Sequence, residues 1–279
     1  MMRLSVRHST VYQFDAPMRF VTQSHRLTPA TSGCQKVLDW SISAEGASFG
    51  AAFVDGAGDH VTTMTVPGPV ERITIVVAGT VETSGNDGIL RRHRETISPM
   101  VYLEATQATH PNRAILGLRD LALGGAQGRL DQAHRLAAAV ADAIAYVPGT
   151  TSPQTTAAEA LELGHGVCQD HAHALVAVAI AAGMPARYVT GYLFAEGEAG
   201  GEAGERPEGE TAEASHAWAE IHVDKLGWIG FDPANRCCPD ERYIRLGSGR
   251  DSREAAPIRG IARGGGAEAL DVSVVVAQQ

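Results

Sequence analysis

The sequence lacks the features that mark nucleic-acid-binding, secreted and membrane proteins. The 23 Lys and Arg residues are outnumbered by 32 Asp and Glu residues, which gives a formal net charge of −9, and they form no cluster along the sequence. The basic surface that binds nucleic acid is therefore missing. No stretch approaches the ~20 apolar residues of a membrane span, and the first residues hold no apolar core of signal-peptide length. We therefore expect a soluble, cytoplasmic protein whose partner is a peptide, a protein or a small molecule, not nucleic acid or a membrane.

Cysteine is also scarce. The four cysteines are too few for a disulfide framework in 279 residues, and none forms a C-x-x-C motif, so reduced thiols are expected. The adjacent pair Cys237 and Cys238 could be a redox device or a soft-metal site. Adjacent residues make a strained bridge, however, and no histidine has ligand spacing near them, which favours ordinary thiols. We expect neither a metal nor a cofactor.

The pattern of apolar residues changes once along the chain. Residues 3–82 alternate or run β-branched between Gly- and Pro-containing breaks, which predicts a β-rich domain. Residues 83–127 show little periodicity, and the domain boundary falls among them. The expected division is a β-rich domain at 1–105 and a second domain at 106–279.

The second domain mixes helices and strands, so the fold class is α+β. A helical repeat ends at Pro148 and Gly149, and the next helix begins with the capping-box pair Thr156 and Glu159 and ends at Gly164. The helices are predicted at 131–147, 156–164 and 167–183, and the strands at 187–194, 216–223, 227–232 and 270–276, the last as an edge strand.

Cys168 opens the third of these helices. A cysteine attacks only as thiolate, and the first turn of a helix favours an anion through its unpaired N–H groups and the positive end of the helix dipole. Gly164 and Gly166 would let a substrate backbone approach, and the Cys168 N–H could help to hold an oxyanion. The alternative is that Cys168 is a small buried hydrophobe, as most cysteines are.

His216 and Asp232 lie on two strands that should form a hairpin. A thiolate needs an imidazole partner, and the imidazole needs an acceptor that fixes its tautomer. Because side chains alternate between faces, His216 and Asp232 share a face only if paired residue numbers sum to an even value, such as 218 with 232. This requires an odd-numbered loop, for example three residues with Gly227 at its end in a bulge.

Four ordered segments resemble the core of the transglutaminase-like superfamily, which is related in architecture to papain-type cysteine proteases. The segments are GVCQD, ARYVTGYL, SHAWAEI and GWIGFDPAN. The family's order of Cys, His and Asp falls here on Cys168, His216 and Asp232. The first hundred residues resemble the β-rich N-terminal domain of bacterial members, and residues 249–260 resemble their C-terminal segment. The resemblance implies a catalytic-cysteine helix packed on an antiparallel sheet.

The resemblance also implies acyl chemistry on an amide bond. Cys168 would attack the carbonyl, His216 would protonate the leaving amine, and Asp232 would orient His216; water then completes hydrolysis, whereas an amine completes transamidation. Bacterial members are mostly described as candidate proteases, so hydrolysis of peptide or isopeptide bonds is the first expectation. Some are thought to work alongside ATP-grasp peptide ligases. A peptide acyltransferase and a non-catalytic peptide-binding module remain alternatives.

Several residues around the triad have two interpretations. Trp218 shares the face of His216 and could wall the substrate cleft or fill the core, and Gly166 is a further cleft candidate. Tyr188 and Tyr192 share a face of the neighbouring strand, as cleft lining or core. The sequence does not fix the oxyanion-binding side chain, the substrate or the oligomeric state.

Three other features lie outside the predicted triad. His165 is close to Cys168 in sequence and is an alternative base to His216, but it is the weaker candidate because it sits in a Gly-flanked turn without an orienting acid. Glu220 and His222 continue the face of His216 toward the turn and should meet solvent. The Gly- and Glu-rich insert at 195–214 should be a mobile loop that solubilises the protein or covers the site.

Overall fold

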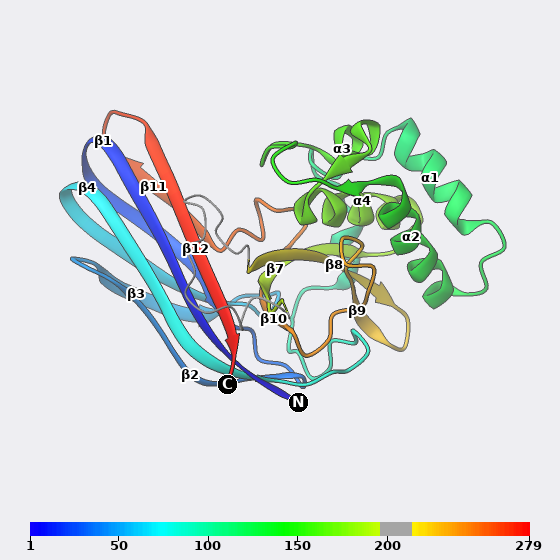
Figure 1. Cartoon of the computed structure of the whole chain (residues 1–279), viewed down its shortest axis with the longest axis horizontal. Coiled ribbons are helices and arrows are strands. Elements are labelled where there is room, and N and C mark those ends of the chain that lie inside the picture. Colours follow the sequence, from blue (N-terminus) through cyan, green and yellow to red (C-terminus); the bar gives the residue numbers. More distant parts are fainter. Residues whose placement is uncertain (196–213) are drawn as a thin grey trace, which may run out of the picture.

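The structure is a computed structural model that describes residues 1–195 and 214–279, so all but the two ends of the predicted acidic loop lie outside it. A six-stranded sheet stands beside a four-stranded sheet that carries the helices (Figure 1). The α+β class is confirmed. The elements are β1 (Met2–Thr28), β2 (Gln35–Ala44), β3 (Ser48–Val54), β4 (His60–Thr83), η1 (Pro99–Leu103), α1 (Arg113–Leu123), α2 (Arg129–Ala143), β5 (Ala145–Tyr146), α3 (Ala157–Leu163), β6 (His165–Gly166), α4 (Cys168–Ala181), β7 (Ala186–Leu193), β8 (Ser215–Val223), β9 (Gly227–Phe231), β10 (Tyr243–Gly249), β11 (Ile258–Arg263) and β12 (Glu268–Gln278).

The first sheet is built on two long antiparallel strands, β1 and β4. Successive side chains of a strand point to opposite faces, and the even-numbered residues of β1 from Leu4 to Phe14 are buried on one of them. Tyr12 and Phe14 pack with Ile73 and Ile75 of β4 in this sheet's own hydrophobic core. Breaks in the β1–β4 register let the long pair bend around that core.

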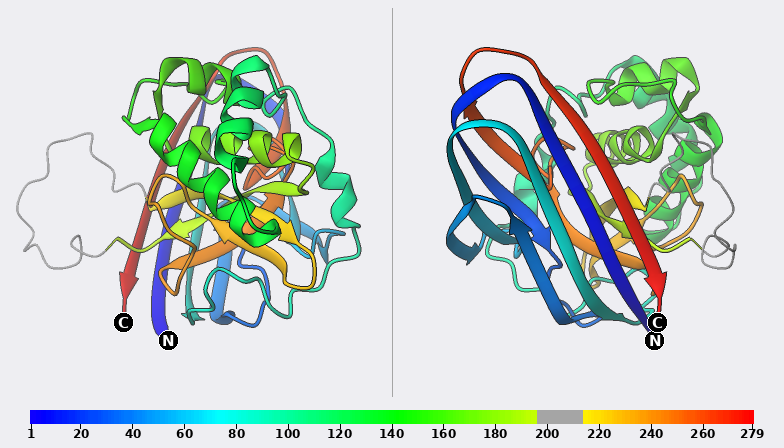
Figure 2. Two further views of the ribbon diagram at one scale, coloured as in Figure 1. Left: turned by 90° about the vertical axis from the view of Figure 1, so that its right-hand side faces the viewer. Right: turned by 60° about the vertical axis from the view of Figure 1, so that its left-hand side comes forward.

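The last strands of the chain join this first sheet. β12 pairs with residues 4–14 of β1 and β11 with residues 20–25, so the predicted strand at 270–276 exists but belongs to the N-terminal sheet. The C-terminal residues of the predicted 106–279 unit therefore pack with the 1–105 unit. The N–H of Gln279 donates to the carbonyl of Arg3, which places the two ends of the chain side by side (Figure 2).

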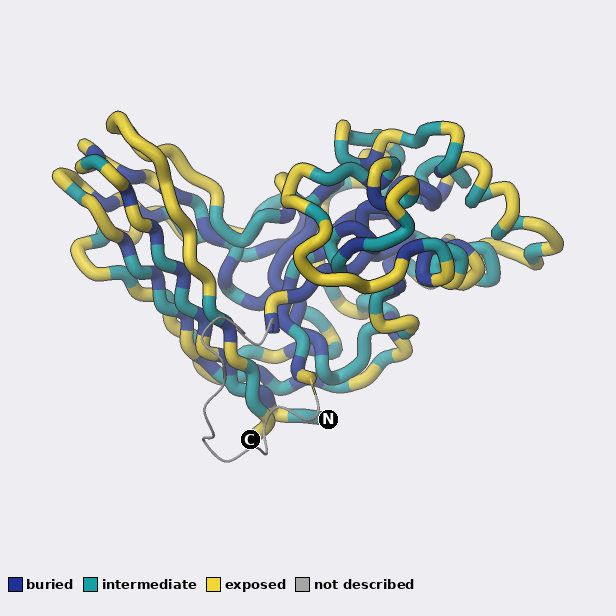
Figure 3. The backbone as a smooth tube through the Cα atoms, turned by 45° about the horizontal axis from the view of Figure 1, so that its top comes forward, coloured by how far each residue is buried: buried dark blue, intermediate teal, exposed yellow. Residues whose placement is uncertain are grey.

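The second sheet has the order β10-β7-β8-β9, and α4 crosses one of its faces. α4 is buried on nearly all sides because α1, α2 and α3 cover it (Figure 3). The three predicted strands here are confirmed, whereas α1 and β10 were not predicted. No helix of the described residues combines the length and the apolarity needed to cross a membrane.

Residues close in sequence to Cys168 determine where α3 ends and where α4 begins. Thr156 and Glu159 form the predicted capping box, and Gly164 ends α3 in the left-handed region with φ 72°. α2 ends at Ala143, earlier than the predicted 147, because β5 (Ala145–Tyr146) instead pairs in parallel with β6 directly before Cys168.

A buried ion network occupies the face of the second sheet opposite the helices. Glu220 accepts from Nε of Arg187 at 2.6 Å and from Nε of Arg245 at 3.0 Å. Arg245 also donates to Asp59 at 2.6 Å, and Arg187 to Glu95 at 2.7 Å. The expectation that Glu220 meets solvent is wrong, because this face of the strand is covered by the first sheet and its connections. Burial alone would raise the pKa of Glu220, but the two guanidinium groups lower it to about 2.

Removing the central charge should destabilise the fold. Glu220→Gln leaves two buried arginines short of an anion, and the free energy of unfolding is expected to fall by about 3–5 kcal/mol. Urea unfolding monitored by circular dichroism measures this. Asp120→Asn, which removes one partner of the exposed Arg119–Asp120 pair, is the control and should change little. Equal effects of the two substitutions would contradict a structural role for the network.

Candidate active site

The β8–β9 hairpin has the register that the triad requires. Ala219 pairs with Phe231 and Val223 with Gly227, so paired numbers sum to an even value. Three residues, 224–226, form the loop between the last pair, and Gly227 has φ 83°. The predicted three-residue loop is therefore confirmed. His216 and Asp232 consequently share one face of the hairpin.

His216 and Asp232 make direct contact. Nε2 of His216 lies 2.6 Å from Oδ2 of Asp232, and both residues are buried. The same carboxylate oxygen accepts from Nδ2 of Asn235 at 2.7 Å and from the hydroxyl of Tyr243 at 2.8 Å, while Oδ1 accepts from the Asn235 N–H at 3.2 Å. These donors fix the carboxylate and hence the plane of the imidazole.

The contact is an ion pair at neutral pH. Burial on its own would lower the pKa of His216, but hydrogen bonds to Asp232 and Cys168, together with their negative charges, raise it to about 10. Burial would raise the pKa of Asp232, and the hydrogen bonds from His216, Asn235 and Tyr243 lower it instead. His216 is therefore an imidazolium across the physiological range.

Cys168 meets His216 from the first turn of α4. Because Asp232 occupies Nε2, Nδ1 is the ring nitrogen left to interact with the Cys168 sulfur, which helps to raise the pKa of His216. Asp170 does not contact this pair: its Oδ2 accepts from the Val167 N–H at 2.8 Å and from the Thr151 hydroxyl at 2.6 Å, which anchors the start of the helix. The structure thus brings Cys168, His216 and Asp232 together.

Cys168 and His216 line a cavity of about 380 Å³ between the two sheets. Gln169, Tyr188 and Thr190 join them from the helix-bearing side. Burial and the negative charges of Cys168 and its neighbours raise the pKa of Tyr188 well above its usual value, so its hydroxyl stays protonated. Of the two tyrosines with open roles, Tyr188 is the one that lines this cavity.

The opposite side of the cavity comes from the first sheet. His8, Thr10 and Tyr12 of β1 line it together with Leu270 and Val272 of β12. The sequence prediction missed this wall, because nothing local shows that residues near both ends of the chain pair and face Cys168.

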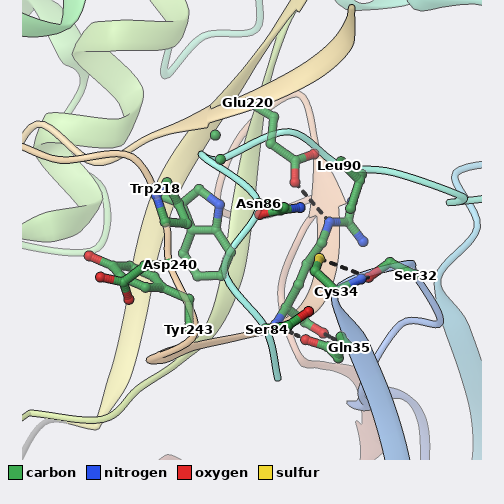
Figure 4. A pocket seen from close by; sticks show the side chains of 14 residues that line it. Ser32, Cys34, Gln35, Ser84, Asn86, Leu90, Trp218, Glu220, Asp240 and Tyr243 are labelled. Carbon is green, nitrogen blue, oxygen red and sulfur yellow. Dashed lines mark hydrogen bonds and ion pairs between the residues drawn. The ribbon is translucent and has the colours of Figure 1, made fainter. Parts of the chain in front are cut away.

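The three tentative cleft residues do not line this cavity. Trp218 stacks on His216 with ring centroids 6.4 Å apart and lines a separate small cavity of about 40 Å³ behind it (Figure 4). Tyr192 is buried with its hydroxyl 2.8 Å from Nδ1 of His8. Gly166 is needed because a Cβ there would lie 2.6 Å from the Asp170 carboxylate. These three residues pack around the cavity that contains Cys168 and His216 without lining it.

None of the other candidate groups lines the cavity that contains Cys168 and His216, although Cys237 exchanges backbone hydrogen bonds with Asp232. His165 contacts the Thr150 hydroxyl at 3.0 Å and does not line the cavity. Cys237 and Cys238 are free thiols, and burial raises the pKa of both. Across residues 1–195 and 214–279, no group of three or more His, Cys, Asp or Glu side chains is arranged to hold a metal ion.

Two supporting residues were missed for different reasons. Asn235 follows Asp232 by three residues, and its backbone N–H donates to the Asp232 carboxylate. Asp and Asn at this spacing are typical of a turn, so the sequence DPAN indicated that Asn235 would lie beside Asp232. Tyr243 begins β10 and reaches Asp232 only through the sheet order, which leaves no local signal.

Two family descriptions match the chain. Residues 119–233 match the transglutaminase-like superfamily, and residues 4–82 match the bacterial transglutaminase-like N-terminal region. The first range contains the candidate triad, and the second contains β2, β3 and most of β1 and β4.

Individual proteins agree with these matches. An uncharacterized protein of Mycobacterium leprae is 31% identical over 99% of this chain and 99% of its own length. An uncharacterized protein of Mycobacterium tuberculosis is 37% identical over 42% of this chain and 37% of its own length. The crystal structure of a Cytophaga hutchinsonii protein called a "putative cysteine protease" superposes with a TM-score of 0.74 at 20% identity, over 99% of this chain and 90% of that one, so it has the same fold.

The His216–Asp232 ion pair should shift the titration of the His216 ring to higher pH. The His216 ring should lose its proton near pH 10, and Asp232→Asn should lower that pKa because it removes the charge and the main acceptor. Since the folded pKa lies above the ordinary 6.5, the stability that the pair provides is complete below pH 6.5 and lost as pH rises toward 10. NMR titration of the ring measures the shift. Asp240→Asn, whose carboxylate pairs with Arg242, is the control; equal titration in all three proteins would contradict the assignment.

Proposed function

The chain belongs to the transglutaminase-like superfamily, and from this premise we propose that it hydrolyses peptide or isopeptide bonds through a thioester on Cys168. The observation that carries the proposal is the position of His216, which Asp232 holds through Nε2 and which lines the same cavity as Cys168. The charge of the Cys168 sulfur is one cause of the raised pKa of His216, so bond formation at the sulfur removes that charge and makes the imidazolium a better acid as the amine leaves.

The reaction takes two steps. The Cys168 thiolate attacks the carbonyl carbon, an oxyanion forms beside the N–H groups of the first turn of α4, and the C–N bond breaks as His216 gives its proton to the amine. The neutral imidazole then takes a proton from water, the hydroxyl group adds to the thioester, and the carboxylic acid leaves. The thiolate and the imidazolium are restored.

The molecule that accepts the acyl group from the thioester determines whether the reaction is hydrolysis or transamidation. The same thioester yields a new amide when an amine replaces water, and a functional association with an ATP-grasp peptide ligase, which makes amide bonds, stays a prediction. A non-catalytic binding module is less well supported, because it has no use for an imidazolium beside a thiol.

Thiol reactivity tests the nucleophile without a substrate. Iodoacetamide at pH 7 should alkylate Cys168 faster than Cys237 or Cys238, whose pKa values are raised by burial, and His216→Ala should slow only the reaction at Cys168. Peptide mass mapping over time gives the three rates. Labelling of Cys168 no faster than in the urea-unfolded chain would contradict the proposal.

Turnover tests the reaction itself. A peptide pool should yield an acyl-enzyme whose mass identifies the donor, and the adduct should be absent in Cys168→Ala. His216→Ala should lower kcat by roughly 10²- to 10⁴-fold, the usual contribution of a general acid–base group. Adding glycine methyl ester to the assay separates the two acceptors: free acid as the product supports hydrolysis, and the glycine amide in its place supports transamidation.

A further inference from the structure

The wall of the cavity opposite Cys168 is a continuous patch on one face of the first sheet. Thr10 pairs directly with Val272, and Tyr12 pairs directly with Leu270. Directly paired residues have their side chains on the same face, about 4.5–5.5 Å apart at Cβ. These four side chains therefore form one surface, and all of them line the cavity that contains Cys168 and His216.

The apolar part of this surface is uncovered. Leu270 is 56% exposed and Val272 37%, although Val274, the next residue on the same face, is only 4% exposed. The strand thus leaves the packed interface of the two sheets and continues along an open cavity beside a reactive thiol. Large apolar side chains left uncovered at such a place are expected where a ligand covers them.

Apart from the Cys168–His216 pair itself, the described lining of the cavity offers no partner for a charged substrate side chain. No Asp, Glu, Lys or Arg of the described residues lines it. Burial lowers the pKa of His8 to about 4, and burial with the nearby Glu268 raises the pKa of Tyr12 to about 12, so both are neutral at pH 7. A charged side chain would lose its hydration there without compensation.

The acyl part of the substrate is the part that stays in this cavity. The new bond joins the acyl carbon to Sγ of Cys168, which lines the cavity, and the amine departs. We infer that the β1–β12 patch of Thr10, Tyr12, Leu270 and Val272 is the specificity wall for the acyl donor and selects an uncharged, apolar side chain next to the scissile carbonyl. This inference rests on the proposed function of Cys168.

Peptide chloromethyl ketones test the wall, because they alkylate the thiol with loss of chloride and present a chosen side chain next to the reactive carbon. Four tripeptides that differ only at that residue, Leu, Phe, Asp or Lys, are compared by the rate of Cys168 alkylation, measured by mass spectrometry. The Leu and Phe probes are expected to react at least about tenfold faster than the charged ones.

Charge substitutions then locate the selectivity. Val272→Asp should raise the Lys-to-Leu rate ratio by about tenfold, and Leu270→Lys should raise the Asp-to-Leu ratio similarly; a ratio cancels any change in thiol reactivity. Val275→Asp is the matched control, since Val275 is 54% exposed on the opposite face of β12 and should leave both ratios unchanged. Thermal unfolding checks that each variant is folded.

The outcomes separate this inference from the proposed function. Slow alkylation of wild-type Cys168 by every probe and by iodoacetamide contradicts the proposed function. Fast iodoacetamide labelling without a preference for Leu and Phe overturns the wall alone. The wall is also overturned if the wild type prefers Leu and Phe but neither Val272→Asp nor Leu270→Lys changes the rate ratios more than the Val275→Asp control does.

Discussion

The pairing of Ala219 with Phe231 determines which groups can meet at the candidate site. A shift of the β8–β9 register by one residue would turn Asp232 toward the helices and away from His216, because strand side chains alternate between faces. Alternation of side chains along β8 itself places His216, Trp218 and Glu220 on one face of that strand. The first meets the thiol, the second packs behind it, and the third anchors the strand in the ion network. The β8–β9 register and the alternation along β8 therefore determine both the contact of His216 with Asp232 and the residues that pack behind it.

The ion network also relates the two sides of the cavity. Asp59 belongs to the turn between β3 and β4, whereas Arg245 belongs to β10 of the second sheet, and their buried contact fastens one sheet to the other. His8 makes a second such link through Tyr192. Because the patch on β1 and β12 faces Cys168 only while the sheets keep this arrangement, buried polar contacts far from the sulfur fix the width of the site.

Features encoded within a few residues could be predicted from the sequence. The capping box at Thr156, the start of α4 at Cys168 and the three-residue hairpin loop all depend on neighbours in the chain, and all three are confirmed. Features set by distant partners could not be predicted. Glu220 looks like an exposed acid until Arg187 and Arg245 reach it through the sheet order.

The side-by-side position of β1 and β12 has a consequence for biosynthesis. The chain emerges from the ribosome over many seconds, and the helices with the reactive thiol can fold well before residues 268–278 appear. Until then β1 presents an unpaired edge, and the cavity beside Cys168 lacks the side chains of Leu270 and Val272. A nascent chain therefore has an incomplete candidate site, and pairing of β12 with β1 both covers this edge against association and adds the Leu270 and Val272 side of the cavity.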